Sequence, residues 1–255
     1  MPTPYQHLLS AVTTLESPAL PGTIRARLTA ERGAFLLGSI AADVRYLTHR
    51  LRTETHFHEV PPADVWAPIR AVLRAYPELA TPARLASDRA AFVSGYLLHL
   101  IWDARWALDI FCPYYKNGGR WSGWGAAMLH HNALRLMLDR RAFATLPAVD
   151  VAVVLRSAAP DRWVPFIADE ALREWRDRIA DHLSGPQDVE GAALVFAERM
   201  GVSLKRLLNV TQAIERRAAE VHVPGLFDAL ERFGRRAPAD SLRALRWYWD
   251  AQGRE

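Results

Sequence analysis

The chain has 255 residues, of which half are apolar and about a quarter are charged, a composition typical of globular rather than fibrous or disordered proteins. Its 32 basic and 28 acidic side chains leave a formal net charge of only +4, too small and too evenly mixed to indicate a nucleic-acid-binding surface. The single cysteine, Cys112, excludes an intramolecular disulfide.

The sequence also lacks the marks of export and of membrane insertion. Its first residues contain neither the basic region nor the apolar run of a signal peptide. The longest apolar stretch runs from Ala90 to Trp102, includes Ser94 and His99, and is shorter than a membrane span. We therefore expect a cytoplasmic protein with no transmembrane segment, unless an export signal precedes the sequence.

Helical signals dominate the chain from end to end. Proline, serine, threonine or aspartate often precedes a run with a period of 3.6 residues, as at helix N-termini. The expected helices begin near Thr3, Pro21, Pro62, Thr81, Trp124, Asp161, Pro186, Ser203, Pro224 and Ala239. The longest candidate runs from about Ala83 to Phe111, where Pro113 is expected to end it.

An all-α, multi-helix bundle is therefore the predicted fold. Only Val149–Leu155 leaves an alternative open, because this apolar run suits either a short strand or a buried helical turn. Seven of the nine histidines lie at or before His131. We accordingly place the chemistry in residues 1–145 and treat residues 146–255 as a helical annex packed on them, or as part of one continuous domain.

The long helix carries the first candidate ligands, His99 and Asp103. Residues four apart on a helix share a face, so this imidazole and carboxylate can share a metal ion. An ionised carboxylate in so apolar a stretch is costly unless it is paired or bound to metal. Gly95, one turn earlier, would let another backbone approach closely. The alternative is a buried His–Asp hydrogen bond completed by Arg105.

Two shorter segments add Asp43 and His56. Asp43 follows the small residues of Gly38-Ser39-Ile40-Ala41-Ala42 at an expected helix end, where it either points inward or caps the next turn. His56 and His58 would point in opposite directions in an extended segment, so that one is internal and the other exposed. His49 is a candidate of lower rank. Nitrogen and oxygen ligands together suit zinc, with iron or manganese as alternatives.

The order of these motifs resembles the zinc-dependent bacterial phospholipase C family, whose fold is shared by nucleases that cut single-stranded nucleic acids. The stretches GSIAADV, RTETHF and FVSGYLLHLIWD carry the resemblance, within residues 34–115. It implies a helical bundle with a central zinc site formed by Asp43, His56, His99 and Asp103. Asp103 would be able to bridge to a second ion, and His7 matches the early histidine of the family in position.

The sequence departs from the pattern of the three-metal members at three places. Asp109 stands where they carry a histidine six residues after the helix aspartate. Their later His-x-x-x-Glu pair has its nearest equivalent at His130-His131-Asn132, with Arg135 where a glutamate would fall. The phospholipases also bind metal through an N-terminal tryptophan, whereas this sequence begins Met-Pro. Asp109 is left either as a further ligand or as the partner of Arg105.

These observations predict a metal-dependent hydrolase that uses one or more zinc ions. The expected substrate is a small-molecule or lipid phosphoester. Asp43 and Asp103 would have catalytic as well as ligand roles, and Arg45 or Arg52 would contact the phosphate. The alternative is a helical metal-binding scaffold that has lost catalysis and serves as an interaction module.

Overall fold

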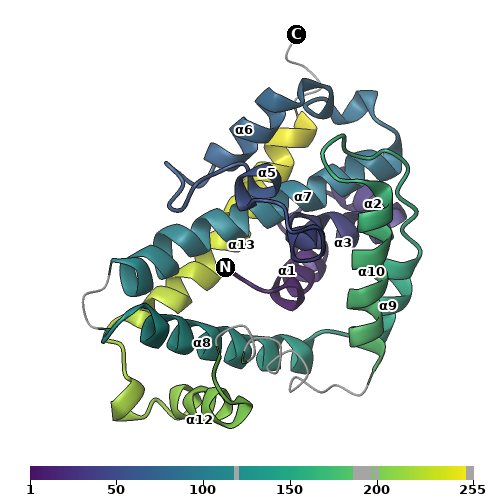
Figure 1. Ribbon diagram of the computed structural model, residues 1–255. Helices are drawn as coiled ribbons and strands as arrows, with labels where there is room; N and C mark the ends of the chain where they lie inside the picture. The colour runs from purple at the N-terminus through teal and green to yellow at the C-terminus, as the bar shows by residue number, and fades with distance from the viewer. Residues whose placement is uncertain (118–120, 186–196, 198–200, 251–255) are drawn as a thin grey trace.

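The computed structural model describes residues 1–117, 121–185, 197 and 201–250, and every regular element within these ranges is helical (Figure 1). The predicted all-α bundle is therefore confirmed. None of the helices that it describes is long and apolar enough to cross a membrane. The principal elements are α1 (Pro4–Glu16), α2 (Gly22–Ala30), α3 (Arg32–Ala41), η1 (Ala42–Val44), α4 (Arg45–Thr48), α5 (Arg52–His56), α6 (Ala67–Ala75), α7 (Ser87–Trp106), η4 (Ala107–Lys116), α8 (Trp124–Thr145), α9 (Ala148–Arg156), α10 (Asp169–Ser184), α12 (Leu204–Glu215) and α13 (Leu226–Asp250).

Local sequence sets several helix starts as expected. At α12 the Ser203 hydroxyl accepts the backbone N–H of Arg206, which is the interaction that a serine N-cap provides. The starts predicted near Thr3, Pro21, Trp124 and Pro224 also lie next to observed helices. The undecided run 149–155 is helical and lies within α9. The short 3₁₀ helix η3 (Pro82–Arg84) begins next to Thr81 as predicted. Helices begin later than predicted after Pro62 and Asp161, and the start at Pro186 lies outside the described residues.

The prediction that Pro113 ends the long helix is wrong. After Trp106 the chain continues as the π-helix η4, which includes Pro113 and ends at Lys116. A proline disrupts an α-helix because it lacks an N–H and its ring clashes with the carbonyl four residues earlier. The wider π turn uses bonds five residues back, such as the one from the Asn117 N–H to the Cys112 carbonyl, 2.9 Å.

The predicted helix start at Ala239 is wrong in a similar way, because α13 passes through Pro238 without ending. Buried residues lie on both sides of this proline, including Ala237 and Ser241. Ser241 accepts a hydrogen bond from the Trp102 indole of α7 at 3.1 Å. Packing of α13 along α7 therefore outweighs the local cost of the proline.

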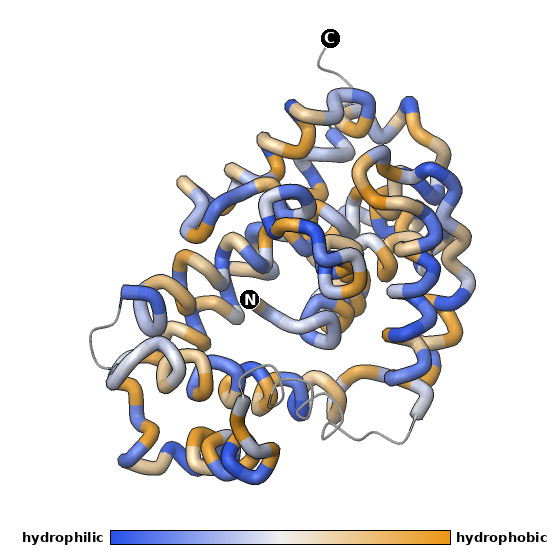
Figure 2. Tube along the Cα trace, in the orientation of Figure 1, coloured by the Kyte–Doolittle hydropathy of each residue, from blue (hydrophilic) through white to orange (hydrophobic). Residues whose placement is uncertain are grey.

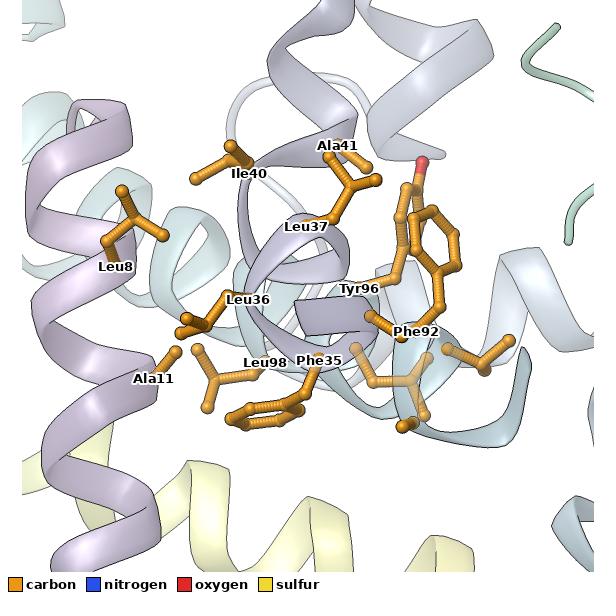
Figure 3. Packing of buried hydrophobic residues seen from close by; sticks show 14 of the residues in the cluster. Leu8, Ala11, Phe35, Leu36, Leu37, Ile40, Ala41, Phe92, Tyr96 and Leu98 are labelled. Carbon is orange, nitrogen blue, oxygen red and sulfur yellow. The ribbon is translucent and has the colours of Figure 1, made fainter. Parts of the chain in front are cut away.

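The core is built around a close crossing of α3 and α7. A Cβ atom at Gly38 would lie 2.0 Å from the Phe92 carbonyl oxygen, and one at Gly95 would lie 2.1 Å from the Phe35 carbonyl oxygen. The two backbones thus touch, as predicted for Gly95. Figure 3 shows Leu8 and Ala11 of α1 next to Leu36 on one side of α3, with Phe92 and Tyr96 of α7 on the other.

Helices from residues 146–255 share this core. The Trp175 indole of α10 donates to the Ile40 carbonyl of α3 at 2.9 Å, and Arg105 of α7 forms a largely buried ion pair with Asp240 of α13. In Figure 2 hydrophilic and hydrophobic residues alternate along α10, as expected for a helix with one face on the core. The separate roles assigned to residues 1–145 and 146–255 stay a prediction.

Candidate metal centre

Four elements bring five predicted site residues together. His7 comes from α1, Asp43 from the turn η1 at the end of α3, His56 from the last turn of α5, and His99 and Asp103 from one face of α7. All five side chains are buried, none more than 4% exposed. Ligand atoms of His7, His99 and Asp103, and of Asp43, His56 and His99, form two groups whose members lie within 4.8 Å of one another.

The atoms at the centre of this cluster are the Nε2 atoms of the histidines and the carboxylate oxygens. His56 Nε2 lies 3.1 Å from Asp103 Oδ2, 3.7 Å from Asp43 Oδ1 and 3.3 Å from His99 Nε2. His99 Nε2 is 3.8 Å from Asp103 Oδ2. His7 Nε2 lies 3.3 Å from Asp103 Oδ1, and its ring stacks on that of His99 with centroids 3.8 Å apart.

Contacts behind the cluster orient two of the imidazoles. The Nδ1–H of His99 donates to the Ser39 carbonyl oxygen at 2.8 Å, so a neutral His99 presents the lone pair of Nε2 to the cluster. His56 Nδ1 lies 2.9 Å from the Thr55 hydroxyl. Such partners fix the rotation of a metal-binding imidazole and select the nitrogen that faces the ion.

The expectation of an extended segment at His56 and His58 is wrong. Residues Arg52–His56 form the short helix α5, and Phe57 then adopts a left-handed conformation with φ of 58°. The turn keeps both imidazoles on the side of the cluster, with ring centroids 6.4 Å apart. His58 donates from Nδ1 to the Glu59 carbonyl at 2.7 Å, and its Nε2 lies 3.4 Å from Arg52 Nη2.

Several buried polar atoms of the cluster have no hydrogen-bond partner. Within the described residues His7 Nδ1 has none, and His7 Nε2 and Asp103 Oδ1 meet only each other, at 3.3 Å and without hydrogen-bond geometry. A buried polar atom without a partner costs about 1–3 kcal/mol, so such atoms indicate a missing ligand. A tetrahedral zinc ion with Zn–N bonds near 2.0–2.1 Å sets its ligand atoms roughly 3.3 Å apart. The distances from His56 Nε2 to Asp103 Oδ2, His99 Nε2 and Asp43 Oδ1, which are 3.1, 3.3 and 3.7 Å, fit four ligands around one ion.

The electrostatics also suit a cation. Burial lowers the pKa of His56 to about 3 and that of His99 well below its ordinary value, so both imidazoles are neutral at neutral pH. Burial and the neighbouring Asp103 carboxylate raise the pKa of Asp43 to about 6. Burial acts to raise the pKa of Asp103 as well, but the Arg52 guanidinium and His56 hold it well below its ordinary value. Two buried carboxylates therefore lie beside the imidazoles of His7, His56 and His99, which together are a donor set for a divalent ion.

The remaining predicted residues lie around or away from the cluster. Arg52 Nη2 donates to Asp103 Oδ2 at 2.6 Å and its side chain is 18% exposed. Asp109 pairs with Arg105 at 3.6 Å and with Arg236 at 3.9 Å, which matches the alternative of an ion pair with Arg105. Arg45 stacks over the Tyr46 ring, with its guanidinium carbon 4.8 Å from the ring centroid. The exposed His49 makes no part of either ligand group.

Sequence reasoning missed the contribution of α8. His131, Arg135 and Asp139 are buried on one face of this helix. Asp139 accepts hydrogen bonds from Thr3 and, at 3.1 Å, from Gln6, the residue next to His7. Their spacing of four residues was the available signal, but it did not show that this face turns toward α1.

Comparison with known families agrees with this geometry. The family model for zinc dependent phospholipase C matches residues 6–182, more than half of the chain. The chain belongs to this family. The match extends the predicted resemblance over residues 34–115 in both directions, and it includes all five residues of the cluster. No match was found among curated proteins or solved structures. The zinc dependent phospholipase C assignment thus confirms the family suspected from the three motifs.

Proposed function

We propose that this chain is a zinc-dependent hydrolase of a phosphoester, with one or more zinc ions held by His7, Asp43, His56, His99 and Asp103. The observation that carries the proposal is the convergence of these five buried side chains, whose ligand atoms form two groups within 4.8 Å. The mixed nitrogen and oxygen donors suit zinc best, and iron or manganese would also be accepted.

When bound, zinc would act as a Lewis acid on the phosphoryl group and lower the pKa of a coordinated water. The chain supplies the groups that handle protons around it. Asp43, whose pKa burial and Asp103 raise to about 6 in the absence of metal, would use one carboxylate oxygen as a ligand and accept a proton at the other. Asp103 stays ionised beside Arg52 and is the carboxylate that lies within reach of all three imidazoles.

Arg52 is the proposed contact for the substrate phosphate. Its guanidinium already touches Asp103, and its partial exposure leaves donor atoms able to bind an incoming anion. A planar guanidinium matches two phosphoryl oxygens at once. The proposal uses Arg52 rather than Arg45, because Arg45 stacks on Tyr46. A substrate role for Arg45 stays a prediction.

Hydrolysis of chromogenic phosphoesters tests the proposal. Zinc-loaded protein is assayed with bis(4-nitrophenyl) phosphate and 4-nitrophenyl phosphate, beside His99→Ala and the control His49→Ala. We expect metal-dependent hydrolysis that is lost in His99→Ala and kept in His49→Ala, with the helical circular dichroism retained by both. Equal hydrolysis by His99→Ala and wild type would remove the cluster from the mechanism.

A second candidate is a structural metal site in a non-catalytic scaffold. The observations that favour it are the enclosure of all five ligands and the engagement of Asp109 in ion pairs instead of a further metal site. A structural metal contributes directly to folding free energy. Under this alternative a chelator lowers the melting temperature strongly while no phosphoester is hydrolysed. Under the hydrolase proposal the loaded protein is active.

A further inference from the structure

His58 is a buried histidine that lies beside the cluster of proposed ligands and belongs to neither of its two groups. Its Nδ1 lies 2.7 Å from the backbone carbonyl oxygen of Glu59. A carbonyl oxygen only accepts, so the ring carries its proton on Nδ1. The other nitrogen, Nε2, lies 3.4 Å from Nη2 of Arg52. Because a guanidinium only donates, Nε2 meets it with the lone pair of a neutral imidazole.

The three guanidinium nitrogens of Arg52 have different surroundings. Nη2 donates to Asp103 Oδ2 at 2.6 Å and also faces His58 Nε2, so both of its hydrogens have an acceptor. Nε is buried and has no hydrogen-bond partner. Nη1 has no acceptor within the described residues either, but it is not buried as Nε is, and the side chain as a whole is 18% exposed. Nη1 is therefore the nitrogen left for a ligand that approaches from solvent.

Asp103 and His58 differ as partners of Arg52. Asp103 Oδ2 also lies 3.1 Å from His56 Nε2, inside the proposed metal centre, so this oxygen is shared between the guanidinium and the ion that the cluster would hold. His58 Nε2 has no ligand role in either group of metal-binding atoms. His58 is thus the partner of Arg52 whose contact does not compete with the metal.

The backbone around His58 is anchored on both sides. Directly before it, the Phe57 ring packs edge-on against that of Phe166, with centroids 5.0 Å apart. After it, the Lys116 ammonium group at the end of η4 donates to the Val60 carbonyl oxygen. An acceptor on a segment held in this way can keep a long arginine side chain in one orientation. Less side-chain entropy is then lost when the guanidinium binds an anion.

We propose that His58 is a positioning residue for phosphate binding: together with Asp103 it holds Nη2 of Arg52 and so directs Nη1 toward the phosphoryl group. The proposal rests on the proposed function, in which Arg52 contacts the substrate phosphate. His58 acts through Arg52 and does not touch the substrate. Because the guanidinium is planar and rigid, fixing Nη2 on two acceptors also fixes where the N–H groups of Nη1 point.

Binding of inorganic phosphate to zinc-loaded protein, measured by isothermal titration calorimetry, tests this role. The side chain in His58→Asn can still donate to the Glu59 carbonyl but is too short to accept from Arg52, whereas His58→Gln places an oxygen near the position of Nε2. We expect His58→Asn to weaken phosphate binding roughly 3- to 10-fold, as loss of one hydrogen bond does. His58→Gln should bind nearly like wild type. The control Glu59→Gln changes an exposed side chain of the same turn and should leave binding unchanged.

A double-mutant cycle separates positioning from a general structural effect. If His58 acts only through Arg52, His58→Asn should weaken phosphate binding in the wild-type background but not in Arg52→Gln. Zinc content and helical circular dichroism, measured on the same samples, should stay at the wild-type level in both His58 variants.

Several results would overturn the proposal. They are a wild type that does not bind phosphate, a His58→Asn variant that binds it like wild type, an equal loss in the wild-type and Arg52→Gln backgrounds, a His58→Gln variant as weak as His58→Asn, and loss of zinc together with phosphate. Should His58→Asn fail to fold, His58→Leu, which also lacks an acceptor, takes its place and is judged by the same results.

Failure of the proposed function would look different. Phosphate binding that depends on His58 through Arg52, in a protein without phosphoesterase activity, would keep the positioning role and reject the hydrolase. Hydrolysis of bis(4-nitrophenyl) phosphate by His58→Asn with an unchanged Michaelis constant, together with unchanged phosphate binding, would keep the hydrolase and reject the role of His58.

Discussion

Replacing Gly95 by alanine tests whether the close crossing of α3 and α7 builds the metal centre. The added Cβ would lie 2.1 Å from the Phe35 carbonyl oxygen and 2.8 Å from the Ser39 nitrogen, both backbone atoms of α3. Because real Cβ atoms essentially never approach heavy atoms within 3.0 Å, the helices would have to separate by about 1 Å.

The expected cost follows from this geometry. Overpacking a core costs about 1–3 kcal/mol, and we expect about 3 kcal/mol here because neither backbone atom can rotate away. For a chain of this size that corresponds to a melting temperature lower by roughly 10 °C. Zinc affinity should fall as well, because Ser39 of α3 orients His99 of α7 through the 2.8 Å hydrogen bond.

Thermal unfolding followed by circular dichroism, with zinc content measured in parallel, gives the readout. Gly234→Ala is the matched control, because Gly234 lies within α13 and a Cβ there would meet no atom within 4 Å. That substitution should stabilise the protein by about 0.5–1 kcal/mol through helix propensity. A Gly95→Ala variant that melts and binds zinc like wild type would refute the account of the crossing.

Two further predictions concern buried carboxylates. Burial raises the pKa of Asp139 to about 6 from an ordinary 3.8, so the stability it confers is full below pH 4 and is lost as the pH rises through 6. Asp139→Asn should remove this loss, so that its free energy of unfolding in urea, relative to wild type, rises by about 3 kcal/mol between pH 4 and pH 7. A difference between variant and wild type that does not change with pH would contradict the pKa assigned to Asp139. Asp240→Ala leaves the largely buried Arg105 without its main partner and should cost about 3 kcal/mol, whereas Asp64→Ala, which breaks an exposed pair with Arg70, should cost about 1 kcal/mol or less. Similar losses from both substitutions would contradict this difference in burial.

The sequence predicted those parts of the centre that depend on local spacing. His99 and Asp103 share a helix face because they are four residues apart, and Asp43 lies at a helix end as its small-residue context indicated. Gly95 likewise predicted a close backbone contact before any partner helix was known. These inferences hold because helix periodicity and residue size act over a few neighbours.

Features that depend on distant packing were not predicted. The left-handed Phe57, which keeps His56 and His58 on one side, has no local signal of the kind that glycine gives. Helix α13 continues through Pro238 because its flanking residues pack on α7. Arg135 appeared in the sequence only as a departure from a family pattern. The contact of this face of α8 with α1 joins Asp139 to Gln6, more than 130 residues apart.

Elemental analysis of zinc-loaded, desalted protein tests the central claim most directly, with wild type measured beside Asp103→Ala and His49→Ala. The account predicts about one or more zinc ions per chain in wild type and in His49→Ala, and loss of zinc in Asp103→Ala. Wild-type protein that holds no zinc after loading, or an Asp103→Ala variant that holds as much as wild type, would contradict the assignment of this cluster as a metal centre.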